Sequence, residues 1–155
     1  MPTLEETVEY IKKVHGNQKT KGGEPYWTHP VAVMSLLPRG ISEEAQHAAL
    51  LHDVIEDCGV KPETLLNKGY SARTVWLVVK LSRPNNGETY QQWISDLVAY
   101  EDSDLLAIKI ADCEHNSDPE RIKKLPFKER SVATRYERAL KKLRNAKKRL
   151  DQEQP

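Results

Sequence analysis

The stretch AALLHDVIED, from Ala48 to Asp57, constrains this chain more than any other part of its sequence. On a helix with about 100° per residue, its ionisable side chains fall within roughly 140° of one another, opposite large apolar side chains. The ionisable residues are His52, Asp53, Glu56 and Asp57, and the apolar ones are Leu50, Leu51, Val54 and Ile55. The apolar stripe requires burial, whereas a solvated face rarely places a histidine beside three carboxylates. We therefore predict a core helix that presents a metal site.

The balance of charges limits the classes of ligand. The chain has 155 residues, 24 of them basic and 23 acidic, which gives a formal net charge of +1. Because this balance gives no overall attraction to nucleic acid or to an anionic membrane, an anionic ligand must be met by a local group of cations. No apolar run approaches the roughly 20 residues of a membrane span, and no secretory signal is visible. Cys58 and Cys113 are too few for a disulfide framework. We expect a cytoplasmic protein without specific nucleic-acid or membrane partners, and we leave a homo-oligomer open.

Apolar residues recur at helical spacing along the whole chain. The predicted helices run from about Leu4 to His15, Pro30 to Leu37, Ser42 to Asp57, Pro62 to Asn67, Ala72 to Leu81, Thr89 to Tyr100, Asp104 to His115 and Phe127 to Leu150. Thr28 or His29 is expected to cap the second of these helices, and Ser103 the seventh. No stretch shows the sustained alternation that a strand requires. The predicted fold class is all-α, a single helical bundle over residues 1–150, with residues 151–155 as a disordered tail.

A glycine-rich stretch from Gly16 to Glu24 separates the first two predicted helices and is expected to be a loop. Lys19 and Lys21 lie on it, shortly before His29. At this place they could meet the charge of a phosphate without making the whole protein basic. Loop lysines are also commonly only solvated.

A second motif, IKIADCEHN, places Asp112 and Asn116 four residues apart on one helical face. An acid in an apolar helix costs several kcal/mol unless it is paired or bound to a metal ion, so Asp112 is expected to need a cation. With His29, His52 and Asp53 it supplies two imidazoles and two carboxylates. This mixed set suits Mn, Fe, Zn, Co or Ni better than Ca or Mg.

Three ordered segments resemble the HD-domain metal-dependent phosphohydrolases, whose pattern is H…HD…D, and among them the RelA/SpoT-type alarmone hydrolases. The family's Pro-Tyr-x-x-His-Pro, Leu-Leu-His-Asp-x-x-Glu-Asp and Ala-Asp-x-x-x-Asn segments are similar to residues 25–30, 50–57 and 111–116. The resemblance covers roughly residues 14–140. It implies that residues 1–150 form one HD phosphohydrolase domain.

The resemblance also implies roles for single residues. The metal ligands would be His29, His52, Asp53 and Asp112, holding one divalent ion that in this family is most often Mn. Glu56 and Asp57 would orient or deprotonate the attacking water, and Lys19, Asn116 and Tyr136 would contact the substrate. Simpler roles stay open: a helix cap for His29, a solvated helix end for Glu56 and Asp57, a C-cap for Asn116, and packing for Tyr136.

The implied reaction is removal of the 3′-pyrophosphate from the alarmone (p)ppGpp. Three departures from the family pattern reduce positive charge: Gln18 replaces a frequent arginine, Cys113 a basic residue, and Asp118 the arginine that follows the asparagine. Hydrolysis of another nucleotide, such as a dNMP, a cyclic nucleotide or NADPH, is therefore an alternative. A catalytically idle relative that binds a nucleotide or a partner protein is a further one.

Overall fold

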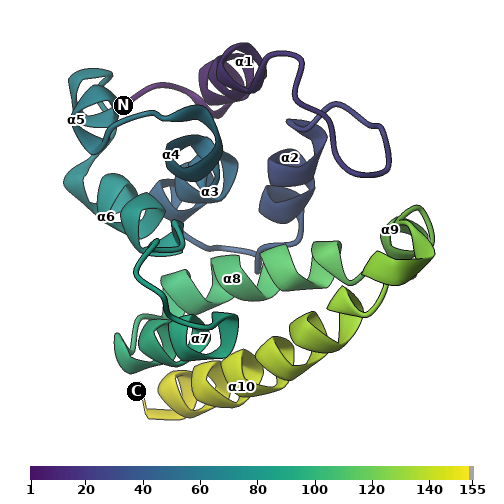
Figure 1. The fold of residues 1–155 in the computed structure, drawn as a ribbon. Helices are drawn as coiled ribbons and strands as arrows, with labels where there is room; N and C mark the ends of the chain where they lie inside the picture. Colours follow the sequence, from purple (N-terminus) through teal and green to yellow (C-terminus); the bar gives the residue numbers. More distant parts are fainter. Residues whose placement is uncertain (154–155) are drawn as a thin grey trace. The chain divides into compact units, whose positions relative to one another are not determined.

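The computed structural model describes residues 1–153 and divides the chain into two units, Met1–Arg83 and Pro84–Pro155. Both units are helical (Figure 1). Among the described residues there is no strand, only an isolated bridge between Lys19 and Pro25 in the predicted loop. The all-α fold class is therefore confirmed, whereas the domain limits stay a prediction.

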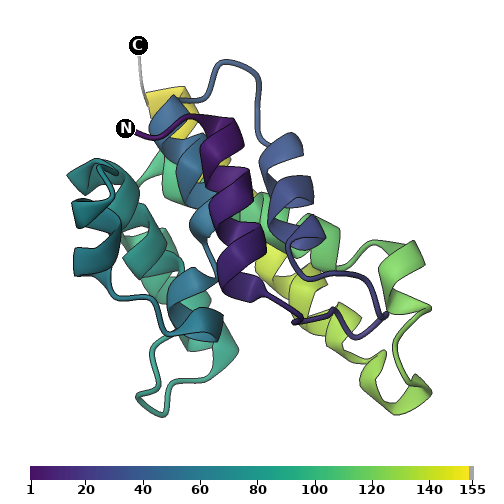
Figure 2. The ribbon, with the colours of Figure 1, turned by 90° about the horizontal axis from the view of Figure 1, so that it is seen from above.

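The N-terminal unit is arranged around one central helix. Its helices are α1 (Leu4–His15), α2 (Thr28–Ser35), α3 (Glu43–Leu51), α4 (Val54–Cys58), α5 (Pro62–Asn67) and α6 (Ala72–Leu81). Helices α1, α2 and α6 all pack on α3, and Figure 2 shows α1 lying along it. Three small residues of α3, Ala45, Ala48 and Ala49, are completely buried, which lets the surrounding helices approach closely.

The sequence predicts one continuous central helix, and this prediction is wrong. The helix breaks at His52 and Asp53, between α3 and α4. In an uninterrupted helix the carbonyl of Ala49 accepts the backbone N–H of residue 53. In this chain the Ala49 carbonyl accepts a hydrogen bond from Nδ1 of His52 at 2.7 Å, so the side chain ends the backbone ladder. Of the four apolar residues of this stretch, Leu50, Leu51 and Val54 are fully buried and Ile55 is half-buried.

The C-terminal unit is organised by its longest helix. It contains α7 (Tyr90–Ala99), α8 (Ser103–Asn116), α9 (Pro119–Ile122), the 3-10 helix η1 (Phe127–Glu129) and α10 (Val132–Glu153). Helix α10 packs along α8 and also on α7 (Figure 1). Its Ala139, Leu140, Leu143 and Ala146 form the buried stripe of an otherwise strongly basic helix.

Both ends of the last predicted helix, Phe127 to Leu150, are corrected by the structure. At the start, the Arg130 side chain donates to the carbonyls of Leu125 and Lys123, which ties the segment before η1 to the residue that follows it, and α10 begins only at Val132. At the end, α10 continues to Glu153, because Asp151 bonds Lys147 at 2.6 Å and accepts from Ser103 at 2.9 Å. Residues 151–153 are thus helical rather than a disordered tail, and residues 154–155 lie outside the described part.

Two predicted caps are also wrong. The α8 cap is Asp102, whose side chain accepts the N–H of Leu105, instead of Ser103. Helix α2 begins after Trp27 without a side-chain cap, and the Thr28 hydroxyl donates to the carbonyl of Pro25. The caps at Thr3, Ser42, Ser71 and Thr89 follow the usual pattern of a hydroxyl accepting a backbone N–H.

Candidate metal centre

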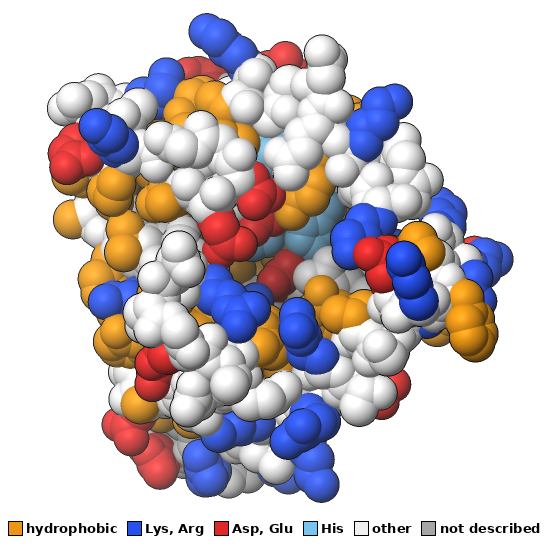
Figure 3. Space-filling model, viewed as in Figure 1, with side chains coloured by type: hydrophobic (Ala, Val, Ile, Leu, Met, Phe, Trp, Pro, Cys, Tyr) orange, Lys and Arg blue, Asp and Glu red, His pale blue; other side chains and the backbone are white. Residues whose placement is uncertain are grey.

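Three side chains of the N-terminal unit place potential metal-ligating atoms close together. His29 comes from the first turn of α2, and His52 and Asp53 come from the break between α3 and α4. One ligand atom from each side chain lies within 4.8 Å of the others. Both histidines are buried and the Asp53 side chain is 16% exposed, so the group is recessed but reachable. In the space-filling view, histidine side chains reach the surface beside acidic ones (Figure 3).

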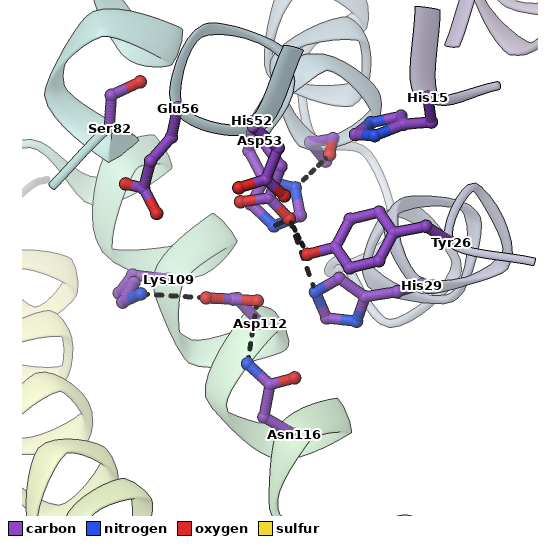
Figure 4. Close-up of polar contacts among 12 residues, drawn as sticks. His15, Tyr26, His29, His52, Asp53, Glu56, Ser82, Lys109, Asp112 and Asn116 are labelled. Atoms are coloured by element: carbon purple, nitrogen blue, oxygen red, sulfur yellow. Dashed lines mark hydrogen bonds and ion pairs between the residues drawn. The ribbon is translucent and has the colours of Figure 1, made fainter. Parts of the chain in front are cut away.

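The Nε2 atoms of both histidines lie near one carboxylate oxygen of Asp53. Oδ2 of Asp53 lies 3.0 Å from Nε2 of His52 and 3.9 Å from Nε2 of His29 (Figure 4). Because Nδ1 of His52 donates to the Ala49 carbonyl, Nε2 is the nitrogen that faces Asp53, and in a neutral imidazole it carries the lone pair that can bind a metal ion. A cation between Nε2 and Oδ2, either a proton or a metal ion, makes their close approach favourable. The donor set, two imidazoles and a carboxylate, therefore fits a first-row transition ion.

Tyr26 belongs to this group, although the motifs in the sequence assigned it no role. Its hydroxyl donates to Oδ2 of Asp53 at 2.6 Å. Tyr26 lies in the same short segment as His29, and Figure 4 shows both side chains directed toward Asp53. The signal available in the sequence was its place in the Pro-Tyr-x-x-His-Pro segment, but the contact itself depends on the fold.

Glu56 and Asp57 follow on α4, one helical turn beyond His52 and Asp53. Oε1 of Glu56 accepts the backbone N–H of Arg83 at 2.6 Å, which fixes the direction of this exposed carboxylate. Oδ2 of Asp57 accepts from the Gln18 side chain at 3.2 Å. Desolvation, and then the negative charge of Asp53, raise the pKa of Asp57 above its usual 3.8. A carboxylate with a raised pKa is a better proton acceptor.

The two predicted phosphate-binding lysines lie exposed on the loop between α1 and α2. This loop is ordered by backbone hydrogen bonds, among them Tyr26 N–H to the Gln18 carbonyl at 2.9 Å. Since Gln18 also bonds Asp57, the base of the loop that carries Lys19 and Lys21 is tied to α4. Their contact with substrate stays a prediction.

The remaining predicted site residues belong to the C-terminal unit. Asp112 is buried on α8, where Oδ2 accepts from Lys109 at 2.8 Å and Oδ1 from Asn116 at 3.2 Å (Figure 4). Lys109 is itself buried, with Nζ 4.4 Å from the centre of the Trp93 ring. Asp112 thus has the cation that the sequence requires for it, and that cation is a lysine one helical turn earlier.

Charge and burial act against each other at this pair. Burial lowers the pKa of Lys109, but the carboxylate of Asp112 more than offsets this, so the lysine pKa is raised and Lys109 is charged. Tyr136 on α10 is half-buried, with its ring 6.2 Å from that of Tyr90. Burial and then the charge of Asp112 raise the pKa of Tyr136, so its phenol is neutral. These contacts account for Tyr136 by packing, and its contact with substrate stays a prediction.

The two cysteines lie in surroundings that do not activate a thiol. Burial is the first cause that raises the pKa of Cys58, to about 11, followed by the charges of Asp57 and Asp53. Cys113 is completely buried, and burial raises its pKa too. Neither thiol is therefore activated as a nucleophile.

No helix within residues 1–153 is long and apolar enough to cross a membrane.

The comparison with known protein families decides the family of this chain. The model of the HD domain family matches residues 7–154, a range that includes parts of both units. The chain belongs to the HD domain family.

Several relatives carry names from alarmone metabolism. The chain is 32% identical over 117 residues to the guanosine-3′,5′-bis(diphosphate) 3′-pyrophosphohydrolase of Aquifex aeolicus, and 37% identical over 111 residues to a probable enzyme of that name from Synechocystis. It is also 34% identical over 119 residues to a GTP pyrophosphokinase of Streptomyces coelicolor. These matches take in 70%, 66% and 73% of this chain but only 16%, 15% and 14% of the relatives. The chain therefore spans a small part of each relative's length.

One solved structure shares the fold over nearly the full length. It is described as a metazoan ortholog of SpoT that hydrolyzes ppGpp and plays a role in starvation responses. The TM-score is 0.73, and the match covers 98% of this chain and 94% of that one. At 22% sequence identity the likeness shows the fold alone.

Proposed function

We propose that this chain is a metal-dependent phosphohydrolase that removes the 3′-pyrophosphate from (p)ppGpp. The observation that supports this most is the group formed by His29, His52 and Asp53, whose ligating atoms lie within 4.8 Å, with Glu56 and Asp57 one helical turn beyond. The names of the relatives support the choice of substrate.

The metal would be one divalent ion held by His29, His52 and Asp53. Asp112 is proposed as the fourth ligand on the H…HD…D pattern of the sequence. Mn is our first choice, with Fe, Co, Ni or Zn as alternatives, because imidazole and carboxylate together suit these ions. When bound, such an ion lowers the pKa of water to about 7 and neutralises charge on a phosphoryl oxygen.

Glu56 and Asp57 would handle the proton of the attacking water. The water oxygen bonds the phosphorus nearest the ribose, the bond from this phosphorus to the 3′ oxygen breaks, and that oxygen takes up a proton. Glu56 suits the role of base because the Arg83 N–H fixes its carboxylate. Asp57 suits proton sharing because its pKa is raised. The products are pyrophosphate and GDP or GTP.

Substrate binding is proposed for Lys19, Lys21, Asn116 and Tyr136. The lysines supply positive charge on the ordered loop before α2, and Asn116 and Tyr136 supply an amide and a phenol. The acid at position 118 weakens the case for a highly charged nucleotide. The substrate assay must therefore include nucleotides that carry fewer phosphates.

The experiment is a substrate panel with metal. The purified chain is incubated with Mn²⁺ and ppGpp, a dNMP, a cyclic nucleotide or NADPH, and products are separated by ion-exchange chromatography. We expect pyrophosphate and GDP from ppGpp. Glu56→Gln should lower kcat by about 10²- to 10⁴-fold, the usual contribution of a general base. The matched control Glu120→Gln changes an exposed acid of the C-terminal unit and should keep full activity.

Each outcome has a separate meaning. Turnover of another nucleotide, with ppGpp inert, overturns the substrate and keeps the reaction class. Turnover of none, together with no bound Mn²⁺, contradicts the enzyme proposal. Metal and nucleotide binding without turnover would identify an idle relative.

A further inference from the structure

We infer that Tyr26 is a positioning residue that fixes the carboxylates of Asp53 and Asp57 relative to each other. This inference rests on the proposed function, in which Asp53 holds the metal and Asp57 handles the water. Beyond that function, it assigns to Tyr26 the role of linking the positions of these two acids.

Tyr26 is linked to both acids. Its hydroxyl donates to Oδ2 of Asp53 at 2.6 Å. Its backbone N–H donates at 2.9 Å to the carbonyl of Gln18, the residue whose side chain bonds Asp57. Hydrogen bonds to a charged acceptor are about twice as strong as those between neutral groups. The position of Asp53 relative to Asp57 therefore depends on Tyr26.

The ring of Tyr26 is held in place from two sides. Its centre lies 4.9 Å from the His15 ring and 5.8 Å from the ring of His29. On the backbone, Tyr26 N–H donates to the Gln18 carbonyl at 2.9 Å, and His29 N–H donates to the Tyr26 carbonyl at 3.0 Å. The hydroxyl position is thus set by ring packing and by the segment that also carries a proposed ligand.

Gln18 reinforces the same arrangement from the other side of Asp57. Its amide nitrogen donates to Oδ2 of Asp57 at 3.2 Å, while its amide oxygen contacts Nδ1 of His15 at 2.9 Å. Asp57 is therefore bonded by Gln18, and Asp53 by Tyr26. Tyr26 joins the two sets of contacts, because its backbone N–H also bonds the Gln18 carbonyl.

Tyr26→Phe tests the inference because it removes the hydroxyl and keeps the packed ring. Loss of a partner that orients a metal ligand typically costs 10- to 100-fold in metal affinity or activity. We expect the Kd for Mn²⁺ to rise by about that factor. We also expect the visible spectrum of the Co²⁺-loaded protein to change, because Asp53 is no longer oriented.

Tyr70→Phe is the matched control. The Tyr70 hydroxyl lies 2.6 Å from Oγ1 of Thr7, a bond as short as that of Tyr26, and Tyr70 is buried. Thr7 in turn contacts Nδ1 of His47, so this network is structural. The control makes the same chemical change in the same unit and should lower the Tm without changing the Kd for Mn²⁺ or the Co²⁺ spectrum.

The measurements are calorimetric titration with Mn²⁺, the Co²⁺ spectrum, and thermal unfolding of the metal-free proteins. A higher Kd and a changed spectrum in Tyr26→Phe alone support the inference. Wild-type values in Tyr26→Phe, or equal changes in Tyr70→Phe, overturn it and leave the proposed function intact. If the wild-type chain binds neither Mn²⁺ nor Co²⁺, the proposed function and the inference both fail.

Discussion

Asp53 and Asp112 are both recessed acids that the sequence assigns to one metal ion, yet their surroundings differ. Asp53 sits at a break between two short helices and is contacted by a phenol and two imidazoles, none of which carries a fixed charge. Asp112 sits inside a long helix and is bonded to the ammonium group of Lys109. One acid is surrounded by metal-ligating groups, and the other has a permanent counterion.

The difference separates two ways of satisfying a buried charge. A carboxylate beside neutral lone-pair donors gains most from an added cation, whereas one paired with lysine is already neutralised. The group around Asp53 should therefore respond strongly to metal. The Lys109–Asp112 pair should in addition stabilise the metal-free protein.

Removing the counterion should give the largest effect on stability. Lys109→Met leaves the Asp112 charge buried without its ammonium partner, and breaking a buried pair in this way costs about 3–5 kcal/mol. Urea unfolding of the metal-free protein measures the change. Lys123→Met is the control, because its 2.7 Å pair with Glu120 is exposed and such pairs contribute about 0–1 kcal/mol. Equal losses in the two variants would show that the buried pair has no special role.

Metal addition should give the next largest effect. At a free Mn²⁺ concentration of about 100 times the Kd, the free energy of unfolding should rise by ~2.7 kcal/mol. Asp53→Asn should remove most of this rise, and Asp112→Asn should reduce it if both acids hold the ion. An undiminished rise in Asp112→Asn would mean that Asp112 is only the partner of Lys109, and thermal unfolding with and without Mn²⁺ distinguishes these results.

The smallest expected effects concern how stability depends on pH. Ionisation of Asp57 in the N-terminal unit should lower stability, whereas ionisation of Asp151 in the C-terminal unit should raise it. The pKa of Asp57 is raised, so its ionised form costs stability at neutral pH, and Asp57→Asn should slightly raise the Tm of the metal-free protein. Bonds to Lys147 and Ser103 lower the pKa of Asp151, so Asp151→Asn should slightly lower the Tm.

Acidification of the two variants checks these signs. The Asp57→Asn gain should fade as the pH falls through the raised pKa, and it should vanish below 3.8, where both folded and unfolded states are protonated. The Asp151→Asn loss should persist in part below 3.8, until the lowered pKa is passed. Parallel behaviour of the two variants across this range would contradict the opposite signs expected for the two acids.

The extent of most helices could be predicted from the sequence because local chemistry determines it. Thr3 and Ser71 accept backbone N–H groups where their helices begin, and α1 and α6 have the predicted bounds. The break at His52 could not be predicted, since the apolar period continues through it. It depends on the imidazole reaching the Ala49 carbonyl, a contact that no pattern of residue types contains.

The same distinction applies to the candidate site. The sequence brought His29, His52 and Asp53 together through a family pattern, and the structure places one potential ligating atom of each within 4.8 Å of the others. It also indicated that Asp112 needs a cation, but not that Lys109 supplies it. A lysine between isoleucines on a helix is usually solvated, and this one is buried because α7 places Trp93 over its ammonium group.

The central claim is that one divalent ion is held by the histidines and acids of the HD pattern. The most direct test is anomalous diffraction at the Mn absorption edge from crystals of the chain grown with Mn²⁺. We predict a single strong peak bonded to Nε2 of His29, Nε2 of His52 and carboxylate oxygens of Asp53 and Asp112. Absence of a peak at His52 and Asp53, or a peak bonded elsewhere, would contradict this claim.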